Sequence, residues 1–436
     1  MPTRPRDTQS AVAPTRPAAS RAFWHPQLPW IPLAISLAVL IAAAFAVPPV
    51  RDAAMLSAVS EAHLARPAGY VALAPLSNVL DTLTLLSARQ HGAVVLGLLA
   101  LWAAWRGARP RCRRGWRSHI ASLATVLAAI VTAYAAAVFL PRPMAYLASH
   151  DADILRIDFH SHTAASKDAR QTFSVERNRA WHRAGGYDVV YVTDHATVAD
   201  TERGMANNPP AGRDGVVLLQ GIEATWMREH VGILGAARIY RGLLTPNLRN
   251  VDARGLTIAS AVATREPVVI WNHARELTNR LPFASGPATA GVRAIEISNG
   301  APSEMDRIRP TRPQLVALAE RYGLALTTGS DCHGWGHTAP NWTLMRLANW
   351  RGLDHGALAA RIESVLRDRG FSATRAVERA TADPGTSAVA LAFSVVGVPW
   401  RMLTTLSAGE RLMWLVWTWA IAGAVLLRRR RHRVPS

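Results

Sequence analysis

Apolar residues are concentrated near the two ends of the chain, where they form long uncharged runs. Four such runs lie at residues 30–47, 92–105, 120–140 and 412–427. A helix needs about 20 mostly apolar residues to cross the hydrocarbon core of a bilayer, which is roughly 30 Å thick. Three of the runs approach or reach that length, and the run at 92–105 reaches it if its helix begins earlier. The pattern therefore predicts four transmembrane helices.

Two apolar segments allow another interpretation. The run at 30–47 has the form of a secretory signal cleaved after Ala46, but the long tail before it and the further apolar runs after it favour a membrane anchor. The run at 388–400 is broken by Gly397 and Pro399. Because it is short for a span, we expect it at the membrane interface. A fifth crossing there would invert either the soluble segment or the C-terminus.

The pattern changes between residues 151 and 375, where short apolar runs alternate with amphipathic stretches. Strands are predicted at 154–159, 187–193, 216–222, 231–234, 268–271, 294–297 and 324–328, and helices at 174–184, 256–265, 314–322 and 356–367. This alternation is typical of an α/β fold with a parallel barrel or sheet, in which functional residues gather at the C-terminal strand ends.

The same pattern divides the chain into five parts. We predict a disordered basic tail at 1–29, a transmembrane region with about three helices at 30–150, the α/β domain at 151–375, a linker or interfacial segment at 376–411, and a C-terminal transmembrane helix with a basic tail at 412–436.

The chain carries a formal net charge of +19, which lies mostly outside the α/β segment. Residues 151–375 hold 27 Lys and Arg against 23 Asp and Glu, which leaves +15 for the flanks. Arginines gather before residue 30, between residues 106 and 117, and after residue 427. Because basic flanks of transmembrane helices stay in the cytoplasm, four spans place all three there and the α/β domain on the other side. The predicted location is a bacterial inner membrane, with this domain facing the periplasm or cell exterior.

Side chains that can bind metal follow the predicted strands, at or just after each strand end. In chain order they are His160, His162, Asp194, His195, Glu223, His230, His273, Glu296, Asp331 and His333. In an extended chain, His160 and His162 point to the same side, so both imidazoles can meet one ion. A barrel brings its strand ends into one mouth, so we expect one metal site. Away from these ends, we expect three histidines to be ordinary surface or loop residues: His182, His337 and His355.

The strand-end residues fall into motifs with a fixed order. These are Asp158-Phe159-His160-Ser161-His162-Thr163, Thr193-Asp194-His195, Gly221-Ile222-Glu223, His230-Val231-Gly232-Ile233-Leu234-Gly235, Asn272-His273 and Gly329-Ser330-Asp331-Cys332-His333. In this order they resemble the polymerase and histidinol phosphatase (PHP) superfamily, over the soluble half of the chain only. The resemblance implies a distorted seven-stranded β/α barrel with two or three divalent metal ions, commonly zinc, manganese or iron, that hydrolyses phosphate esters. The family's usual Ala-His-Pro reads Asn272-His273-Ala274 here, which keeps the ligand itself.

The resemblance also implies a role for each matching residue. It makes His160, His162, Glu223 and Asp331 ligands of one metal ion, Asp168, His195 and His333 ligands of a second, and His230 and His273 ligands of a third, with Glu223 bridging. Family members vary between Asp and His at the position of Asp168.

The chemistry of these residue types agrees with that implication. Imidazole and carboxylate ligands suit zinc, manganese or iron, and a structural zinc site would be expected to use cysteines. Such ions lower the pKa of bound water and neutralise phosphoryl oxygens. We expect Asp194 to orient a metal-bound His or the attacking water, and Glu296 either to do likewise or to pair with an arginine. By position, Arg275 and Lys167 are candidates for binding the substrate phosphate.

These observations predict a membrane-anchored, metal-dependent phosphoesterase that acts on a small phosphorylated substrate. One alternative is a nuclease acting on oligonucleotide ends, but a charge of only +4 in residues 151–375 and the lack of a basic-aromatic stripe argue against a nucleic acid partner. A second is a metal-binding sensor without turnover, which would not need the complete ligand set. A third, a transporter, would need ionisable residues within the spans, which have almost none.

Overall fold

The soluble part of the chain is built on one ten-stranded sheet. The computed structural model describes residues 30–108, 115–195, 197–213, 215–226, 229–235, 268–272 and 292–431. The strand order across the sheet is β1-β12-β11-β4-β5-β6-β7-β8-β9-β10, and β2 and β3 form a separate pair. The strands are β1 Val50–Asp52, β2 His63–Ala65, β3 Tyr146–Ala148, β4 Ile154–Ser161, β5 Val189–Val192, β6 Val217–Trp226, β7 Glu229–Leu234, β8 Val269–Asn272, β9 Val292–Asn299, β10 Ala325–Gly329, β11 Asn341–Arg346 and β12 Thr374–Arg379.

The sheet is mixed. β4, β5 and β6 pair in parallel, as do β8, β9 and β10, whereas β7 runs antiparallel to both of its neighbours. On the other side of β4, the strands β11, β12 and β1 pair antiparallel. Every residue of β5, β8 and β10 is buried. This explains their continuous apolar runs, because strands that are covered on both faces do not alternate.

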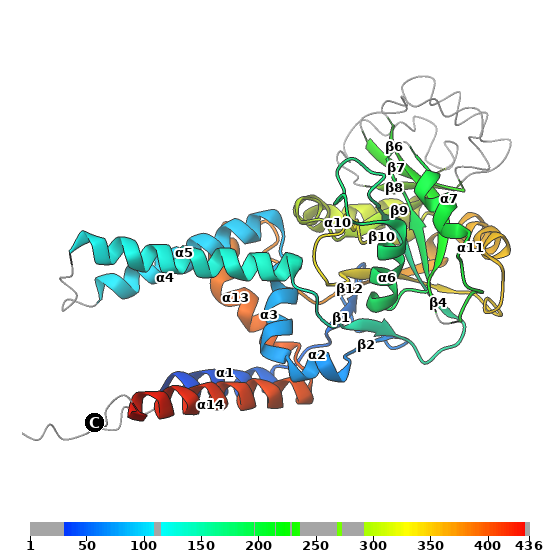
Figure 1. Ribbon diagram of the computed structural model, residues 1–436. Coiled ribbons are helices and arrows are strands. Elements are labelled where there is room, and N and C mark those ends of the chain that lie inside the picture. The colour runs from blue at the N-terminus through cyan, green and yellow to red at the C-terminus, as the bar shows by residue number, and fades with distance from the viewer. Residues whose placement is uncertain are drawn as a thin grey trace, which may run out of the picture.

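The two ends of the parallel part meet, so that the sheet is curled (Figure 1). After β10, the amide of Asp331 donates to the carbonyl of His160 over 2.8 Å, and the amide of His162 donates to the carbonyl of Cys332 over 3.1 Å. The strands β4 to β10 lie between these contacts. The predicted α/β class is confirmed. The sheet is barrel-like, but it differs from the expected seven-stranded barrel because β11, β12 and β1 extend it on one side.

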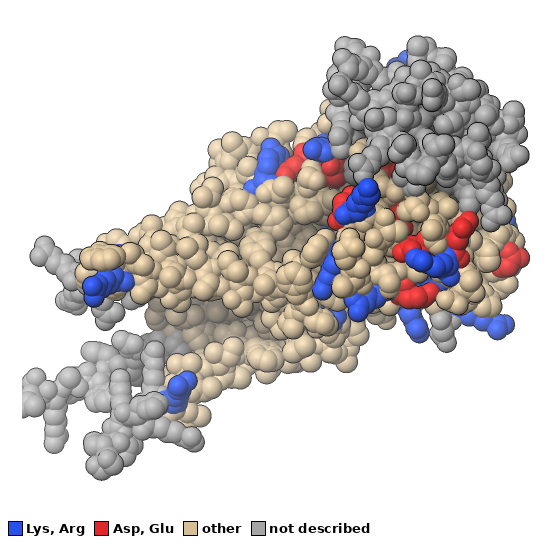
Figure 2. Space-filling view, turned by 45° about the horizontal axis from the view of Figure 1, so that its top comes forward, with Lys and Arg blue, Asp and Glu red and all other residues tan. Residues whose placement is uncertain are grey.

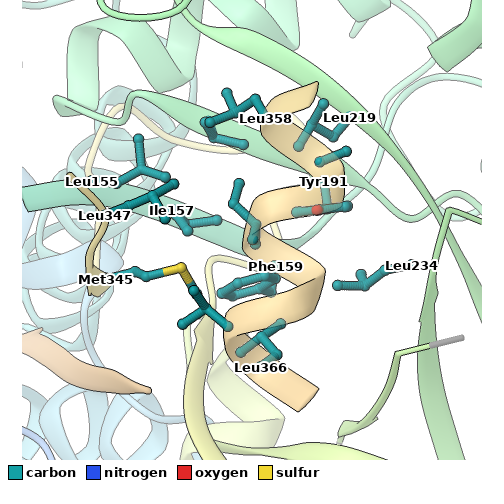
Figure 3. Close-up of a cluster of buried hydrophobic side chains, with 14 of the residues drawn as sticks. Leu155, Ile157, Phe159, Tyr191, Leu219, Leu234, Met345, Leu347, Leu358 and Leu366 are labelled. Carbon is teal, nitrogen blue, oxygen red and sulfur yellow. The ribbon is translucent and has the colours of Figure 1, made fainter. Parts of the chain in front are cut away.

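Helices follow several strands, and one of these helices, α11 His355–Arg369, shares a large hydrophobic core with the sheet. α6 Val175–Gly185, α7 Ala199–Met205, α10 Pro302–Tyr322 and α11 come after β4, β5, β9 and β11. Figure 3 shows Leu358 and Leu366 of α11 among buried side chains from several strands. The same cluster contains Leu155 of β4 and Ala325 of β10. Its burial therefore stabilises the curled form, at about 25 cal/mol per Å² of apolar surface.

α10 is longer than the sequence predicts. The pattern predicts a helix at 314–322, whereas the structure has one continuous helix that also contains Pro310 and Pro313. A proline inside a helix removes a hydrogen bond and is unfavourable. The buried apolar face of α10, which includes Ile308 and Leu315 on both sides of these prolines, offsets that cost. The predicted helix at 256–265 lies outside the described residues.

The soluble domain includes chain from outside the predicted boundaries of 151 and 375. β1, β2 and β3 come from the region predicted to be transmembrane, and β1 is an edge strand of the large sheet. These three strands pack against the rest of the domain, because Val50, Leu64 and Leu147 share a buried cluster with Ile154 and Trp342.

The flanking segments are helical. Their helices are α1 Trp30–Ala44, α2 Ala68–Ala72, α3 Ala74–Thr84, α4 Ala88–Gly107, α5 Trp116–Phe139, α12 Ala388–Ala392, α13 Ser394–Thr404 and α14 Ala408–Arg431. In the described part of the chain, α5 and α14 are long and apolar enough to cross a membrane, and α1 is apolar but shorter. Figure 1 shows α4 with α5, and α1 with α14, projecting from the soluble domain as two arms. The four predicted spans coincide with these helices, and length and composition support two of them.

The flanking helices also contain an internal repeat that we did not predict from the sequence. α2, α3 and α4 begin at residues 68, 74 and 88, and α12, α13 and α14 begin at 388, 394 and 408, so one constant offset relates all three pairs. The two short helices have the same lengths in both copies, 5 and 11 residues. Both copies read Leu-Thr-X-Leu-Ser-Ala, at 83–88 and 403–408. The serine caps the following long helix in each copy, with Gln90 or Glu410 as the reciprocal partner.

The two copies pack reciprocally. α12 and α13 contact α4, while α2 and α3 contact α14. In the same way α5 packs against α3, and α1 packs against α13. One close approach is at Gly97 of α4, where an added Cβ would lie 2.6 Å from the Cβ of Val395 in α13. The two arms are therefore held together by short helices that each copy places on the other.

Candidate metal centre

Four side chains converge near the ends of β4 and β10 and on β6, which continues to Trp226, so that Glu223 lies within this strand and not at its end as the sequence predicts. His160 Nε2 lies 3.1 Å from Glu223 Oε2 and 3.2 Å from His162 Nε2. Asp331 Oδ1 is 3.5 Å from His160 Nε2 and 3.3 Å from His162 Nε2. Asp331 has a positive φ of 51°, a conformation that Asp adopts more readily than most residues. These four residues are the ones that the sequence predicts for a first ion.

A second group lies beside the first. Asp168 Oδ2 is 3.2 Å from His195 Nε2 and 3.4 Å from His333 Nε2. His195 Nε2 is also 3.4 Å from Glu223 Oε2. The ring of His162 stacks on that of His333, with centroids 4.3 Å apart. Ligand atoms of His162, Asp168 and His333 lie within 4.8 Å of one another, so this group could hold an ion of its own.

Glu223 connects these groups to a third position. Its Oε2 faces both groups, and its Oε1 lies 2.8 Å from His230 Nδ1. His273 and Arg275, which the sequence predicts for this side of the centre, lie outside the described residues. Asn272, the last residue of β8, is buried, and neither polar atom of its side-chain amide has a hydrogen-bond partner among the residues that the structure describes.

The imidazoles are oriented through their second nitrogens. His160 Nδ1 is 3.0 Å from Glu296 Oε2, and His162 Nδ1 is 3.0 Å from Ser166 Oγ. His333 Nδ1 is 2.7 Å from its acceptor, the carbonyl of Asp331. Metal-bound histidines typically have such a partner, because it fixes the tautomer and turns the other nitrogen toward the ion. The donor set and its support therefore fit a cluster of divalent cations.

The charged side chains in the centre also favour a bound cation. Burial lowers the pKa of His160, but the carboxylates of Glu223, Asp331 and Glu296 outweigh it and raise that pKa well above its usual value. Burial also lowers the pKa of His162, and hydrogen bonds to Asp331 and Glu223 reverse this and raise it to about 9. The carboxylates thus favour positive charge on the imidazoles, which a bound divalent cation would supply in place of protons.

Asp194 lies next to the first group. Its two carboxylate oxygens accept hydrogen bonds of 2.6 Å from Thr163, one from the amide and one from the hydroxyl. Because Thr163 directly follows His162, Asp194 fixes the chain that carries this ligand. Lys167 is exposed and adjacent in sequence to Asp168.

His182 is not the surface or loop residue that the sequence predicts. It is fully buried on α6, with Nε2 2.8 Å from Asp158 Oδ2 and Nδ1 2.8 Å from the carbonyl of Asn178. Asp158 Oδ1 in turn accepts from the amides of His160 and Ser330, over 3.1 and 3.0 Å. The His182–Asp158 pair therefore joins α6 to the backbone of β4 and to the residue after β10, close to the ligands.

A signal for His182 was present in the sequence. The buried residues of α6 include Asn178, Trp181, His182 and Gly185, which lie at the spacing of one helix face. His182 was expected at the surface because it does not follow a predicted strand, although its spacing matches this buried face. His355 is exposed, as expected.

Comparisons with known proteins add a few solved structures of low similarity. No protein-family model and no curated protein matches the chain. The chain is similar to PsfC from Pseudomonas syringae PB-5123, at 17% identity and a TM-score of 0.35 over 47% of this chain and 87% of that one. It is similar to the lesion-specific endonuclease PfuEndoQ from Pyrococcus furiosus, at 13% identity and a TM-score of 0.35, and spans 56% of its length with 50% of this chain.

A third structure is an amidohydrolase from Chromobacterium violaceum, at 19% identity and a TM-score of 0.28 over 47% of this chain and 96% of that one. Sequence identities and TM-scores this low do not allow the activity of one protein to be assigned to another, because activity depends on the side chains of the site.

Proposed function

We propose that this protein is a metal-dependent phosphoesterase anchored in a membrane. The observation that carries the proposal is one cluster of imidazole and carboxylate side chains: His160, His162, His195 and His230 contact Glu223. Asp168, Asp331 and His333 contact members of that set. Mixed ligands of this kind suit zinc, manganese or iron. The resemblance of the motifs to the PHP superfamily supports the same reaction class.

The chain's own residues would hold the ions and keep their ligands in place. His160, His162 and Asp331 would hold one ion, Asp168, His195 and His333 a second, and His230 with His273 a third, with Glu223 shared. Bound ions would supply Lewis acidity, which lowers the pKa of water and neutralises phosphoryl oxygens.

The open side of the centre is the side of Asp168. The side chains of Asp168 and His195 are 51% and 35% exposed, whereas His160 is fully buried. A substrate would therefore approach from this side. Lys167 lies there and would bind a phosphoryl oxygen, and Arg275 remains a candidate for the same task.

The test is metal content together with hydrolysis by the full chain in detergent. The substrates are p-nitrophenyl phosphate, a panel of nucleotides and short oligonucleotides. Asp331→Asn keeps the size and backbone conformation of its residue while removing the charge, and Glu223→Gln does the same at the bridging position. His355→Gln, at an exposed position of α11, is the matched control.

We expect wild type and His355→Gln to hold two or three ions and to hydrolyse a phosphomonoester. Both site variants should lose at least about tenfold in metal affinity or activity. Hydrolysis of oligonucleotides alone would favour a nuclease. Metal binding without any turnover would favour a sensor, and a wild type that binds no metal would refute the proposal.

We also propose that the flanking helices anchor the protein in a bacterial inner membrane, with the soluble domain on the periplasmic side. The arms expose many large apolar side chains, including Leu37, Leu96, Val131 and Ile421. In Figure 2 their visible surface carries almost no charge except for basic residues at the ends away from the soluble domain. Basic ends that stay in the cytoplasm would place the domain outside.

Labelling of a single cysteine tests this topology. His355→Cys in a Cys112→Ser background puts an exposed thiol on the soluble domain, since Cys332 is buried. A membrane-impermeant maleimide should label it in spheroplasts with an intact inner membrane. Labelling only after lysis would place the domain in the cytoplasm.

A further inference from the structure

α5 ends against the loop that carries the metal-centre residue His333. The amide of Gly336 in this loop donates to the carbonyl of Val138 in α5 over 3.2 Å. The rings of Phe139 and Trp335 meet edge to face, with centroids 6.0 Å apart. Trp335 lies only two residues after His333. A helix long and apolar enough to cross a membrane therefore reaches the rim of the centre.

The contact between α5 and this loop is an exposed apolar patch with a cation in it. Trp335, Phe139 and Leu140 are 51%, 53% and 41% exposed. The guanidinium of Arg170 lies 5.5 Å from the centroid of the Phe139 ring and 5.8 Å from that of Trp335. We call these four residues the rim patch. Exposed aromatic rings beside an arginine are typical of the level where a membrane meets water.

The rim patch adjoins the open side of the centre. The amide of Arg170 donates to the carbonyl of His333 over 2.9 Å, and Arg170 is two residues from Asp168, the most exposed of the ligand candidates that the structure describes. In the described part of the chain, the guanidinium of Arg170 forms no ion pair with a carboxylate. Arg170 therefore places positive charge between the apolar surface and the metal centre.

A second aromatic pair supports the membrane level of the rim patch. At the corresponding end of the other arm, the rings of Phe45 and Trp400 are 6.0 Å apart, and both side chains are exposed. Phe45 directly follows α1, and Trp400 lies on α13, which packs against α1. Aromatic residues at the ends of spans mark the headgroup region.

On the basis of the phosphoesterase function proposed above, we infer that the substrate is a lipid phosphate, a phosphomonoester of a membrane-resident hydrocarbon chain. The phosphate reaches the metal centre past Lys167 and Arg170 while the chain stays on the rim patch and along α5. Hydrolysis adds water across the ester: the water oxygen bonds to phosphorus, the bond from phosphorus to the lipid oxygen breaks, and a water proton goes to that oxygen. The products are a lipid alcohol, which stays in the bilayer, and inorganic phosphate.

The first experiment compares chain lengths with the full protein in lipid nanodiscs. Dioleoyl phosphatidic acid is compared with its water-soluble dibutyryl form and with p-nitrophenyl phosphate. We expect kcat/KM to be at least tenfold higher for the long-chain phosphatidic acid. Efficient hydrolysis of the soluble esters with no preference for the long chain would overturn the inference and leave the phosphoesterase function standing. Hydrolysis of no phosphate ester at all would instead refute the proposed function.

Variants of the rim patch separate its role from that of the centre. Trp335→Ala and Phe139→Ala should each lower kcat/KM for the long-chain ester at least tenfold more than for the soluble esters. Trp116→Ala, at the other end of α5 and 69% exposed, is the matched control and should leave both values unchanged. An equal loss on long and short substrates, or no difference from the control, would overturn the assignment of the patch.

Binding gives a readout that does not depend on turnover. A photoreactive long-chain alkyl phosphonate should label the peptides that contain Phe139 or Trp335, and phosphatidic acid should compete while inorganic phosphate should not. Labelling confined to other peptides would refute the proposed path.

Discussion

A substitution at Gly329, the last residue of β10, tests whether the candidate metal centre depends on close packing behind its candidate ligands. An added Cβ there would lie 2.5 Å from the Cβ of His160 and would also meet Glu296, the partner of that imidazole. Ordinary contacts of this kind are 3.4–4 Å long. Gly329→Ala therefore forces His160 back by roughly 1 Å, whereas metal–ligand distances tolerate only about 0.2 Å.

The expected effect is a loss of metal affinity without loss of a ligand. Disturbing the residues that support a ligand typically costs 10- to 100-fold in affinity, which is about 1.4–2.8 kcal/mol of binding free energy. Overpacking itself adds about 1–3 kcal/mol of destabilisation. Chelator competition measures the affinity, elemental analysis measures the ions per chain, and thermal unfolding followed by circular dichroism shows whether the chain is folded.

Gly92→Ala is the matched control, because Gly92 lies in α4 and a Cβ there would meet nothing within 4 Å. It should keep the wild-type affinity and gain up to about 1 kcal/mol of helix stability. A folded Gly329→Ala protein with wild-type metal affinity would show that His160 is not held where the structure places it.

Two further predictions concern buried charges. Burial raises the pKa of Glu378, but Arg312 and Arg51 outweigh it and lower that pKa to about 2. The ionised carboxylate therefore adds up to about 3 kcal/mol to the unfolding free energy above the unfolded pKa near 4.5, and this stability is lost as the pH falls toward 2. Glu378→Gln should unfold more easily at pH 7 and lose less thermal stability between pH 4.5 and 2 than wild type; identical profiles would contradict this. His182→Leu leaves the buried carboxylate of Asp158 without its imidazole, so the unfolding free energy should fall by about 3–5 kcal/mol and metal occupancy should fall with it; an unchanged unfolding midpoint in thermal denaturation would refute that role.

The α/β class and the convergence of ligands could be predicted because both follow from local pattern. Buried strands leave continuous apolar runs, and a candidate ligand such as His160 or Asp331 lies at or shortly after the end of such a run. The closing contact between the ends of β4 and β10 could not be predicted, because it joins backbone groups of Asp331 and His160, which lie far apart in the sequence. Backbone hydrogen bonds leave little trace in side-chain pattern.

Three other features were not predicted correctly, each for a physical reason. α10 extends beyond its predicted range because the tertiary packing of its apolar face prevails over the local preference of Pro310 and Pro313 against a helix. The internal repeat preserves helix lengths and caps more than residue identities, so apolar composition alone does not reveal it. His182 was missed because its partner, Asp158, lies on a different element, a strand that precedes α6 in the chain.

The reciprocal packing of the two helical copies also determines the order in which parts of the chain can fold during synthesis. α1 ends at Ala44 and its partner α14 begins at Ala408, so the ribosome must add most of the chain before the pair can form. At a typical rate of about 5–20 residues per second, α1 waits on the order of 20–70 s for its partner. The whole soluble domain emerges within that interval and can fold first. The pairing of α1 with α14 then completes the helical part after the domain has folded.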